Sequence, residues 1–494
     1  MLSLAVIFPI AAGFAMLALP LRTRRARELA VEGVTLATSL LVLLCLILRR
    51  GQSQTLLALT DTLSLTLMID GVGGVFTAIV AFLWPLATLY AFEYMEHEGG
   101  ENHFFALYTV TYGVTLGISM AANLMTLYVF YEFLTLSTLP LVMHGTRPEA
   151  VRAGYQYMMY SFFGAALAFI GVMIVTCFGG GGAFVMGGVL GEEFAEAHPV
   201  LLQAGYLCMF VGFGVKAAVF PTHAWLPSAS VAPTPVTALL HAVAVVKAGA
   251  FAIIRMTYFS VGAQLARGTA AQAVAILLAS VTIVYGSTMA VREHHFKRRL
   301  AYSTVSNLSY IVLAASLMSG SGLTAALAHM MFHALIKITL FYCAGAVLVK
   351  TGRTQVESLR GLSRVMPVVC AVYTLAALSL MGTPGLPAFV SKWLIGMAAL
   401  GSATPSVLGI PAGYIGLAAI LISAVLTAIY LMSVSFAMYF RPLEPAGGVE
   451  LGTRCDPTWR MKLPLAVLCA AIVLCGLFSE TIVRSLAAIA AGVM

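Results

Sequence analysis

Residues 201–227 read LLQAGYLCMFVGFGVKAAVFPTHAWLP. The part before Pro221 is almost entirely apolar, and about 20 apolar residues in a helix cross the hydrocarbon core of a bilayer. Lys216 lies near the end of this run, which then meets Pro221 and Pro227. Proline removes a backbone donor and interrupts a helix. The stretch therefore predicts a membrane-spanning helix that is broken beside a buried lysine.

The rest of the 494-residue chain has the same apolar character. Hydrophobic residues make up 61% and charged residues 9%, against about 25% charged residues in an ordinary soluble domain. With a mean hydropathy of +0.97, this composition excludes a soluble globular protein, a disordered chain and a nucleic-acid-binding domain. The apolar runs are continuous rather than alternating, which favours helices over a barrel. The eight cysteines form no C-x-x-C pair, so we expect no disulfide framework and no metal site. No G-x-G-x-x-G follows a strand and no cysteine cluster could hold iron–sulfur, so we expect no cofactor.

We predict an all-α polytopic membrane protein with about fourteen transmembrane helices. The helices are expected near residues 2–20, 29–48, 72–95, 104–121, 124–143, 154–177, 201–220, 233–258, 269–291, 301–318, 322–349, 366–400, 411–440 and 463–490. The polar stretches between them are too short for a separate soluble domain. The apolar N-terminal run precedes its arginines, which is the reverse of a cleavable signal peptide.

Two interruptions occur in mirrored order along the chain. Lys216 precedes Pro221 by five residues, whereas in the run 366–400 Lys392 follows Pro387 by five. Mirrored broken helices are typical of inverted repeats, so we predict two inverted five-helix repeats, each with a broken helix. The expected division is 1–103 for the first three helices, 104–258 for the first repeat, 269–440 for the second, and 441–494 for a loop and the last helix.

The positive charges predict the orientation of the chain. With the N-terminus outside, most of them fall in inner loops, as the positive-inside rule requires. The inner loops then hold Arg22, Arg24, Arg25, Arg27, Arg147, Arg152, Arg292, Lys297, Arg298, Arg299, Lys350, Arg353, Arg360, Arg364, Arg441, Arg454, Arg460 and Lys462. The outer side holds Arg49, Arg50, Arg255, Arg267 and Arg484. Both termini are therefore expected outside, and the basic net charge of +8 reflects topology rather than an anion-binding surface.

Five charged residues remain inside apolar runs, and among the acids only Glu132 is expected at this depth. They are Lys216, Lys247, Lys337, Lys392 and Glu132. A charge at the bilayer centre costs about 2.5–3.5 kcal/mol on insertion scales, so each of them needs a reason. One reading is a set of structural ion pairs, and the other is a proton relay. We favour the relay, because a buried lysine can gain and lose a proton near neutral pH whereas arginine cannot.

Histidines add to this pattern. His329, His333 and Lys337 are spaced i, i+4 and i+8, which places them on one face of a helix. Imidazole titrates near neutral pH and suits proton transfer. Two alternatives stay open for these histidines, namely structural hydrogen bonding to neighbours and axial ligation of haem. His241 lies six residues before Lys247 on a different helix face, so a link between these two needs water or another side chain.

Several ordered motifs carry a family resemblance. They are Lys216-Ala-Ala-Val-Phe-Pro-Thr-His-Ala-Trp-Leu-Pro227 with Ala232-Pro-Thr-Pro-Val-Thr-Ala-Leu-Leu-His241 and Lys247-Ala-Gly; Tyr131-Glu132-Phe133; His333-Ala-Leu-Ile-Lys337 with Leu340-Phe341; and Gly382-Thr-Pro-Gly-Leu-Pro-Ala-Phe-Val-Ser-Lys392. Over about residues 60–440 the chain resembles the proton-translocating antiporter-like subunits of respiratory complex I, Mrp-type cation/proton antiporters and membrane-bound hydrogenases. Its length is similar to that of the D-type Mrp subunit and of the shorter complex I and hydrogenase subunits.

The resemblance implies roles for the deep residues. Glu132 would pair with Lys216 on the broken seventh helix, and Lys247, Lys337 and Lys392 would continue a central hydrophilic axis. His241, His329 and His333 would link the lysines through water. Two departures from the family pattern stand out. The usual Trp-Leu-Pro-Asp ends in Ser228 here, and the second break reads Gly382-Thr-Pro-Gly385 followed by Ala388-Phe389.

The resemblance also implies a function, partners and a location. We expect a proton-translocating subunit in the prokaryotic inner membrane, surrounded by lipid and by other membrane subunits that include related antiporter-like chains. The chain itself is expected to make or break no covalent bonds. The alternatives are a self-sufficient monovalent cation/proton antiporter, a cofactor-bearing redox subunit and a structural scaffold. The transported ion is H⁺; whether Na⁺ also crosses is left open, with Asp61 and Asp70 as candidate cation contacts.

Overall fold

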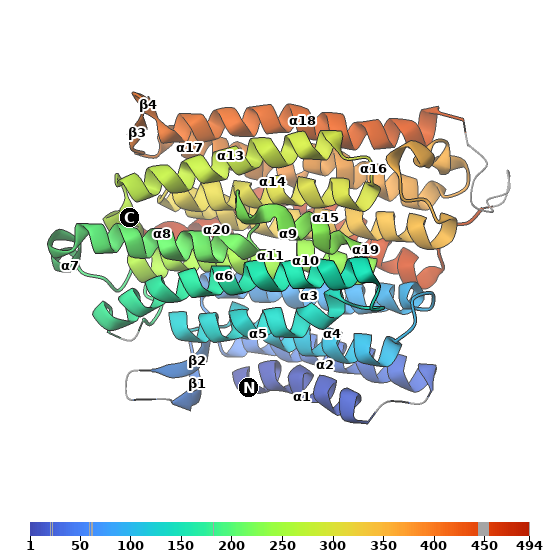
Figure 1. Ribbon diagram of the computed structural model, residues 1–494, viewed down its shortest axis with the longest axis horizontal. Helices are drawn as coiled ribbons and strands as arrows, with labels where there is room; N and C mark the ends of the chain where they lie inside the picture. Colours follow the sequence, from blue (N-terminus) through green and yellow to red (C-terminus); the bar gives the residue numbers. More distant parts are fainter. Residues whose placement is uncertain are drawn as a thin grey trace.

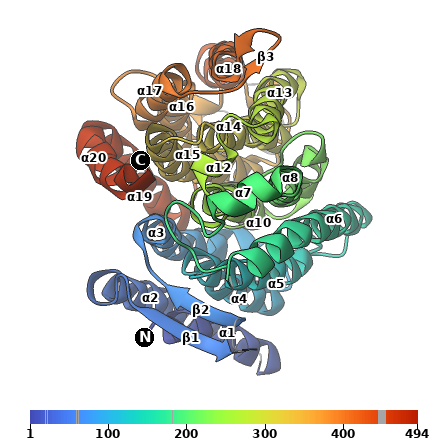
Figure 2. The same cartoon turned by 90° about the vertical axis from the view of Figure 1, so that its left-hand side faces the viewer.

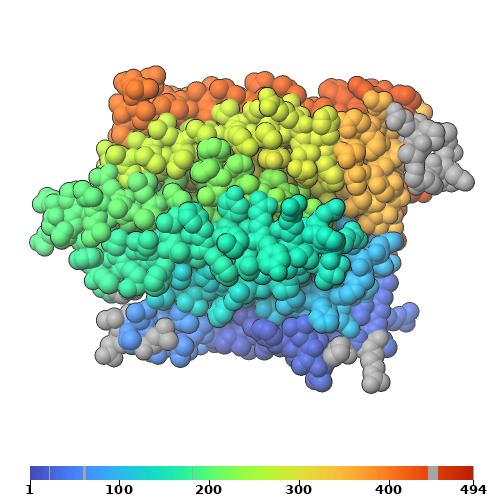
Figure 3. All heavy atoms as spheres, viewed as in Figure 1, coloured from blue at the N-terminus to red at the C-terminus, as the bar shows by residue number. Residues whose placement is uncertain are grey.

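The computed structural model describes residues 1–19, 21, 23–58, 60, 63–180, 182–442 and 454–493. Two residues named above, Arg22 and Asp61, lie outside the described residues. Long helices run side by side between two ends of the molecule (Figure 1). In the space-filling view, early, middle and late parts of the chain form successive bands across one face (Figure 3).

The helices of the first part are α1 (Leu2–Ala18), α2 (Arg24–Leu48), α3 (Gly71–Met95), α4 (Glu101–Ser119), α5 (Leu124–Val142), α6 (Pro148–Phe178), α7 (Glu192–Ala197), α8 (Pro199–Lys216), α9 (Trp225–Ser228), α10 (Thr234–Ala242), α11 (Val245–Arg255) and α12 (Ala263–Ala266). Those of the second part are α13 (Ala270–Arg292), α14 (Phe296–Ser316), α15 (Gly320–Thr351), α16 (Pro367–Met381), α17 (Pro387–Gly401), α18 (Ala412–Phe440), α19 (Trp459–Leu477) and α20 (Ser479–Ala490). Short 3₁₀ turns are η1 (Thr222–Ala224), η2 (Ala229–Val231), η4 (Val356–Leu359), η5 (Leu362–Arg364) and η6 (Ala491–Val493), and η3 (Met256–Val261) is a π-helical segment.

The prediction of an all-helical polytopic membrane fold is confirmed. Within the described part of the chain, ten helices are long and apolar enough to cross a membrane, and α1, α16 and α17 are shorter apolar helices. Two small antiparallel hairpins were not predicted. They are β1 (Ser53–Ala58) with β2 (Ser64–Met68), and β3 (Ser406–Val407) with β4 (Ile410–Pro411). Both lie at the same end of the helix bundle (Figure 1).

Both predicted breaks are present. The first span stops at the end of α8, at Lys216, and continues through η1 and α9 only after the turn at Pro221. The second stops at Met381 and restarts as α17, where Pro387 occupies the first helical turn. Proline is tolerated there because the first backbone N–H groups of a helix have no intrahelical acceptor. The division into repeats at 104–258 and 269–440 stays a prediction.

Two expected helices contain an interruption that was not predicted. The run 233–258 forms one candidate span, Thr234–Val261, but Ala244, with φ −93° and ψ −83°, leaves the helical region between α10 and α11. No proline marks this place. Tertiary packing, rather than the local sequence, interrupts the helix here. The run 463–490 is divided at Phe478, after which α20 starts as a separate helix with Glu480 in its first turn.

Helix α15 forms the centre of the bundle. Viewed along the helices, it lies between α14, α16, α19 and α3, whereas α1 and α2 lie at one edge (Figure 2). Of its most apolar window 89% is buried, against 28% for α2. Ser319 caps its first turn by accepting a hydrogen bond from the Gly322 amide. Because α15 carries His329, His333 and Lys337, its central position determines where the candidate site lies.

Candidate proton-relay site

All four lysines that were expected at depth are buried. Lys216, Lys247 and Lys337 are 0% exposed and Lys392 is 9% exposed. The three candidate histidines, His241, His329 and His333, are also 0% exposed. Glu132 on α5 is half-buried. A set of charged and titratable groups is therefore enclosed by α5, α8, α10, α11, α15 and α17, as the distribution of charges along the sequence predicted.

The first part of the site joins α5 to the end of α8. The Lys216 ammonium donates a hydrogen bond to the Tyr131 carbonyl and lies 3.4 Å from the centre of the Tyr131 ring. The Glu132 carboxylate belongs to the residue that directly follows Tyr131 on α5. Its Oε1 atom is buried and has no hydrogen-bond partner among the described residues. Glu132 and Lys216 are therefore neighbours that do not form a direct ion pair in this conformation.

The middle of the site joins α11 to α15. Nζ of Lys247 lies 2.5 Å from Nδ1 of His333. The rings of His333 and His329 are 5.8 Å apart, and Nδ1 of His329 is hydrogen-bonded to the Ser391 hydroxyl at 2.9 Å. Ser391 directly precedes Lys392 on α17. Titratable groups thus follow one another from Lys247 to the second broken span.

Lys337 points to a different neighbour. Its Nζ atom donates to the Leu300 carbonyl at 3.1 Å and to the Ser303 hydroxyl at 2.7 Å, both on α14. Ser303 is in turn hydrogen-bonded to the Tyr430 hydroxyl of α18 at 2.7 Å. The i, i+4, i+8 spacing therefore brings together the two histidines, whereas Lys337 extends the site toward α14 and α18.

Lys392 closes the far end of the site. Its Nζ atom donates to the carbonyls of Leu380 at 2.7 Å and Met381 at 3.1 Å, the last residues of α16. The Tyr310 ring lies 5.6 Å from this ammonium group and 5.3 Å from the His329 ring. Tyr310 therefore stands between two predicted site residues. Sequence reasoning missed it, because tyrosine is common in membrane helices and no motif marks this one.

Buried nitrogen atoms without protein partners show where water is needed. Nε2 of His329, Nε2 of His333 and both ring nitrogens of His241 are buried and have no hydrogen-bond partner in the described part of the molecule. Buried polar atoms in folded proteins are almost always hydrogen-bonded to protein or to ordered water. The break between α10 and α11 separates His241 from Lys247, so a connection between them also depends on water.

Several charged residues have partners that the sequence did not indicate. Arg255, expected on the outer side of the membrane, is fully buried and makes a two-pronged ion pair with Asp70 at 2.5 and 2.6 Å. Asp70 is therefore bound to an arginine rather than available to a cation, and it also caps α3. Glu93, in the last turn of α3, is a second buried acid, 2% exposed and 2.8 Å from Lys350.

Lys297, Arg299 and Arg353 were expected in loops and are nearly buried instead. Lys297 donates to the Ala232 carbonyl at 3.0 Å, and Arg299 donates to the Glu293 carbonyl at 2.8 Å. These groups lie at helix ends where backbone carbonyls are unpaired, which explains how cations are accommodated there.

Comparison with known proteins identifies the family. Residues 121–435 match the family described as NADH:quinone oxidoreductase/Mrp antiporter, TM, and residues 59–105 match the N-terminus of chain 5 of NADH-ubiquinone oxidoreductase (complex I). The chain belongs to the NADH:quinone oxidoreductase/Mrp antiporter family. The match covers every site residue described above, and the family resemblance inferred from the motifs is confirmed.

Individual members of the NADH:quinone oxidoreductase/Mrp antiporter family are similar over long stretches. NADH-quinone oxidoreductase subunit N of Desulforudis audaxviator is 31% identical over 432 residues, which are 85% of this chain and 83% of that protein. A chain of the Mrp complex from Dietzia sp. DQ12-45-1b is 25% identical, with a TM-score of 0.85 over 99% of this chain and 52% of that one. The membrane-bound sulfane sulfur reductase, an archaeal respiratory membrane complex, contains a chain of the same fold, with a TM-score of 0.85 at 23% identity. The protein is thus an antiporter-like multi-pass membrane subunit of this family.

Proposed function

We propose that this subunit moves protons along the buried groups from Glu132 and Lys216, past Lys247, His333 and His329, to Lys392, with Lys337 and His241 joined through water. The observation that carries the proposal is the contact between Lys247 and His333, because its continuation through His329 and Ser391 reaches the residue beside Lys392. Groups that gain and lose protons and lie within hydrogen-bond reach of one another can transfer protons directly. Where gaps remain, the unpartnered ring nitrogens of His241, His329 and His333 can bind water that continues the path.

The Glu132 and Lys216 couple supplies the switch in this proposal. When the carboxylate approaches the ammonium group, the charged form of Lys216 is stabilised, and when the two separate, the lysine releases its proton more readily. The present conformation, with Lys216 on the Tyr131 carbonyl, represents the separated arrangement. Two arrangements of one charged pair provide the bistable element that coupling to another process needs.

We further propose that the protein works inside a multi-subunit complex of the prokaryotic inner membrane, with both termini on the outer side. The names of similar proteins support this, since they belong to an NADH-quinone oxidoreductase, an Mrp complex and an archaeal respiratory membrane complex. Affinity purification of the tagged chain in mild detergent, followed by mass spectrometry, tests the assembly. Recovery of a lone chain that is active by itself would contradict it.

The relay is tested by substitution at the switch. In Lys216→Ala and Glu132→Ala we expect proton transport into membrane vesicles to fall by roughly a hundredfold, the lower end of the effect of losing a proton-transfer group. Lys216→Arg should be equally inactive, because arginine keeps its charge and releases no proton. Glu149→Ala changes an exposed carboxylate on α6 and serves as the control. Normal transport by the Lys216 and Glu132 variants in fully assembled protein would contradict the relay.

A further inference from the structure

Another acidic group, which no ion pair of the described residues includes, lies on a membrane-spanning helix away from the relay. Glu32 is on α2, eight residues beyond the start of that helix and so about 12 Å from it. Its Oε2 atom is buried and has no hydrogen-bond partner among the described residues. Thr35 donates to the Glu32 backbone carbonyl and leaves the carboxylate untouched.

Three other acids near the start of α2 are bound by arginines. Glu28 pairs with Arg24 at 2.8 Å and with Arg460 at 2.9 Å. Glu96 is held by Arg24, and Glu101 by Arg27. The charged or titratable groups on this part of α2 and on the helices beside it are Arg24, Arg27 and Glu28 on α2, Glu93 on α3 and Glu96 directly after it, Glu101, Tyr108 and Tyr112 on α4, Tyr342 on α15 and Arg460 on α19. Among the ion pairs of the described residues, none includes Glu32, so no cation holds it ionised.

Three further unpartnered polar atoms lie on the neighbouring helices α3, α4 and α15. Tyr108 of α4 lies between Asn102 and Tyr112, which are hydrogen-bonded to Arg27 and Ser39 on either side of Glu32 in α2. The Trp84 ring of α3 is 5.4 Å from the Tyr108 ring, and Tyr342 of the central helix α15 stacks on Tyr90 of α3 at 3.9 Å. Trp84, Tyr108 and Tyr342 are 0% exposed, yet the Trp84 indole nitrogen and the hydroxyls of these two tyrosines have no hydrogen-bond partner in the described part of the chain. The hydroxyl of Tyr112, one turn further along α4, is hydrogen-bonded to the Ser39 hydroxyl at 2.7 Å.

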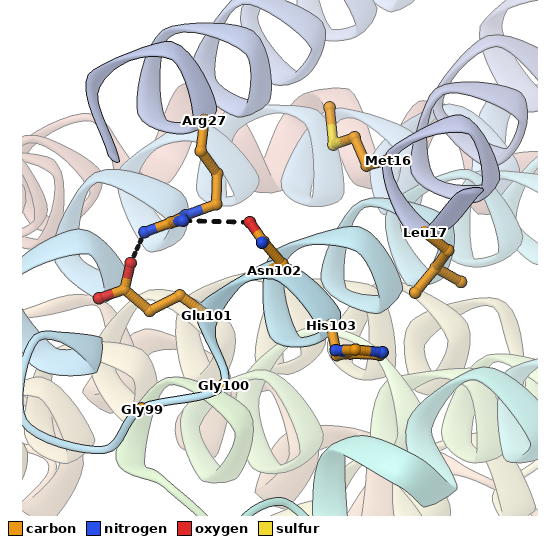
Figure 4. A pocket seen from close by; sticks show the side chains of 8 residues that line it. All are labelled: Met16, Leu17, Arg27, Gly99, Gly100, Glu101, Asn102 and His103. Carbon is orange, nitrogen blue, oxygen red and sulfur yellow. Dashed lines mark hydrogen bonds and ion pairs between the residues drawn. The ribbon is translucent and has the colours of Figure 1, made fainter. Parts of the chain in front are cut away.

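An opening lies at the nearby end of the bundle. A pocket of about 530 Å³ is lined by Met16 and Leu17 of α1, Arg27 of α2 and the segment 99–103. Figure 4 shows Arg27 extending from α2 to Glu101 and Asn102 at this pocket. The Arg27 Nε atom is buried and unpartnered on the described chain. Glu32 lies five residues further along α2, so the pocket opens at the end of the helix that carries this carboxylate.

We propose that Glu32, Trp84, Tyr108 and Tyr342 enclose a water-filled proton-uptake site, entered from the pocket at Arg27 and separate from the lysine and histidine relay. A hydronium ion entering from the pocket transfers its proton to Oε2 of Glu32, forming one O–H bond and leaving one water molecule, and the reverse step releases it. The carboxyl group and three unpartnered donors can each bind water, which buried polar groups require. The site ends at α15, the helix that also carries His329 and His333. The part of this inference that gives Glu32 a role in transport rests on the proposed function.

The test compares two glutamates one helical turn apart. In the intact complex, Glu32→Gln should remove a pH-dependent infrared C=O band of a protonated carboxylic acid, measured in a Glu132→Gln background so that Glu132 does not contribute. Glu28→Gln is the control and should leave this band unchanged, because Glu28 forms ion pairs with Arg24 and Arg460. Tyr108→Phe should shift the band by removing a hydroxyl near the carboxyl group, whereas Tyr112→Phe should not. A band that persists in the Glu32 variant would overturn the proposal.

Transport measurements separate this inference from the proposed function. With Glu132 intact, Glu32→Gln should lower proton transport several-fold in fully assembled protein, and Glu28→Gln should not change it. Normal transport by Glu32→Gln together with inactive Lys216→Ala would overturn the uptake role alone. Normal transport by both variants would overturn the proposed function as well, whatever the infrared band shows.

Discussion

In the span formed by α8 and α9, Lys216 is the last helical residue, and its ammonium group lies on the Tyr131 carbonyl of α5. In the span formed by α16 and α17, Lys392 lies in the second half-helix and reaches back across the gap to the final carbonyls of α16. The two lysines occupy mirrored places in the sequence, yet one contacts a neighbouring helix and the other the free end of its own span.

The difference concerns what stabilises each positive charge. The last carbonyls of a helix have no intrahelical partner and carry a partial negative charge, so α16 offers Lys392 a fixed binding place. Lys216 instead has a carboxylate nearby, and Glu132 can approach or withdraw. A lysine held by fixed dipoles suits the end of a proton path, whereas a lysine beside a movable carboxylate suits a switch.

The largest effect is expected from removing the amine at the second break. Lys392→Ala leaves the carbonyls of Leu380 and Met381 without a donor, which costs about 1–3 kcal/mol for each buried unsatisfied group. We expect a clearly lower melting temperature in detergent together with loss of proton transport. Lys216→Ala frees a single carbonyl and should destabilise the protein less. Equal melting temperatures of the two alanine variants would remove the proposed difference between the breaks.

An arginine at the same place separates the two roles of the lysine. Lys392→Arg keeps donors for the carbonyls of α16 while preventing proton release, because arginine stays charged. We therefore expect a melting temperature near that of the unmodified protein and no transport. If Lys392→Arg transported protons normally, Lys392 would be a structural cap rather than a member of the relay.

An intermediate effect is expected at the first break, where an aromatic ring covers the ammonium group. Tyr131→Leu keeps the backbone carbonyl but removes the ring 3.4 Å from Lys216. A cation over an aromatic face gains about 0.5–2 kcal/mol, so stability should fall by about that amount. Thermal unfolding of the assembled protein measures it. Tyr131→Phe keeps the ring and is the matched control; a loss in the phenylalanine variant equal to that in the leucine variant would contradict the ring contact.

The two breaks could be predicted from the sequence because their signals are local. Proline and a charged residue inside an apolar run are visible without knowledge of the fold, and they located Lys216 and Lys392 correctly. The interruption before Lys247 has no such signal: Val243 and Ala244 are ordinary helix residues that leave the helical conformation within the packed structure. Packing overrides the local helix preference of these residues, and the hydrophobic periodicity of the sequence gives no sign of the interruption.

The partners of the site residues were less predictable than the residues themselves. Tyr310, Ser303 and Ser391 belong to residue types that are frequent in membrane helices, and only three-dimensional proximity gives them a role. Arg255 stands at the end of an apolar run, where a surface position and a buried one look alike. Its partner Asp70 is 185 residues away in the chain, so sequence reasoning had no means of pairing the two.

The smallest effects are expected from the backbone at the two breaks. After α16 the chain turns through Gly382, with φ +101°, whereas after α8 it turns through Ala218, with φ +56°. A left-handed conformation costs a residue with a side chain roughly 1–2 kcal/mol, so Gly382→Ala should lower stability by about that amount. Its new methyl group would also lie 3.4 Å from the Lys392 side chain that spans this gap.

The reciprocal change at the first break should be nearly neutral. Ala218→Gly removes the left-handed cost but increases the freedom of the unfolded chain, which costs roughly 0.5–1 kcal/mol. Chemical or thermal unfolding of both variants in the same detergent measures the difference between the breaks. If Gly382→Ala were as well tolerated as Ala218→Gly, the second break would be flexible enough to move its lysine, and Lys392 would then be as able to switch as Lys216.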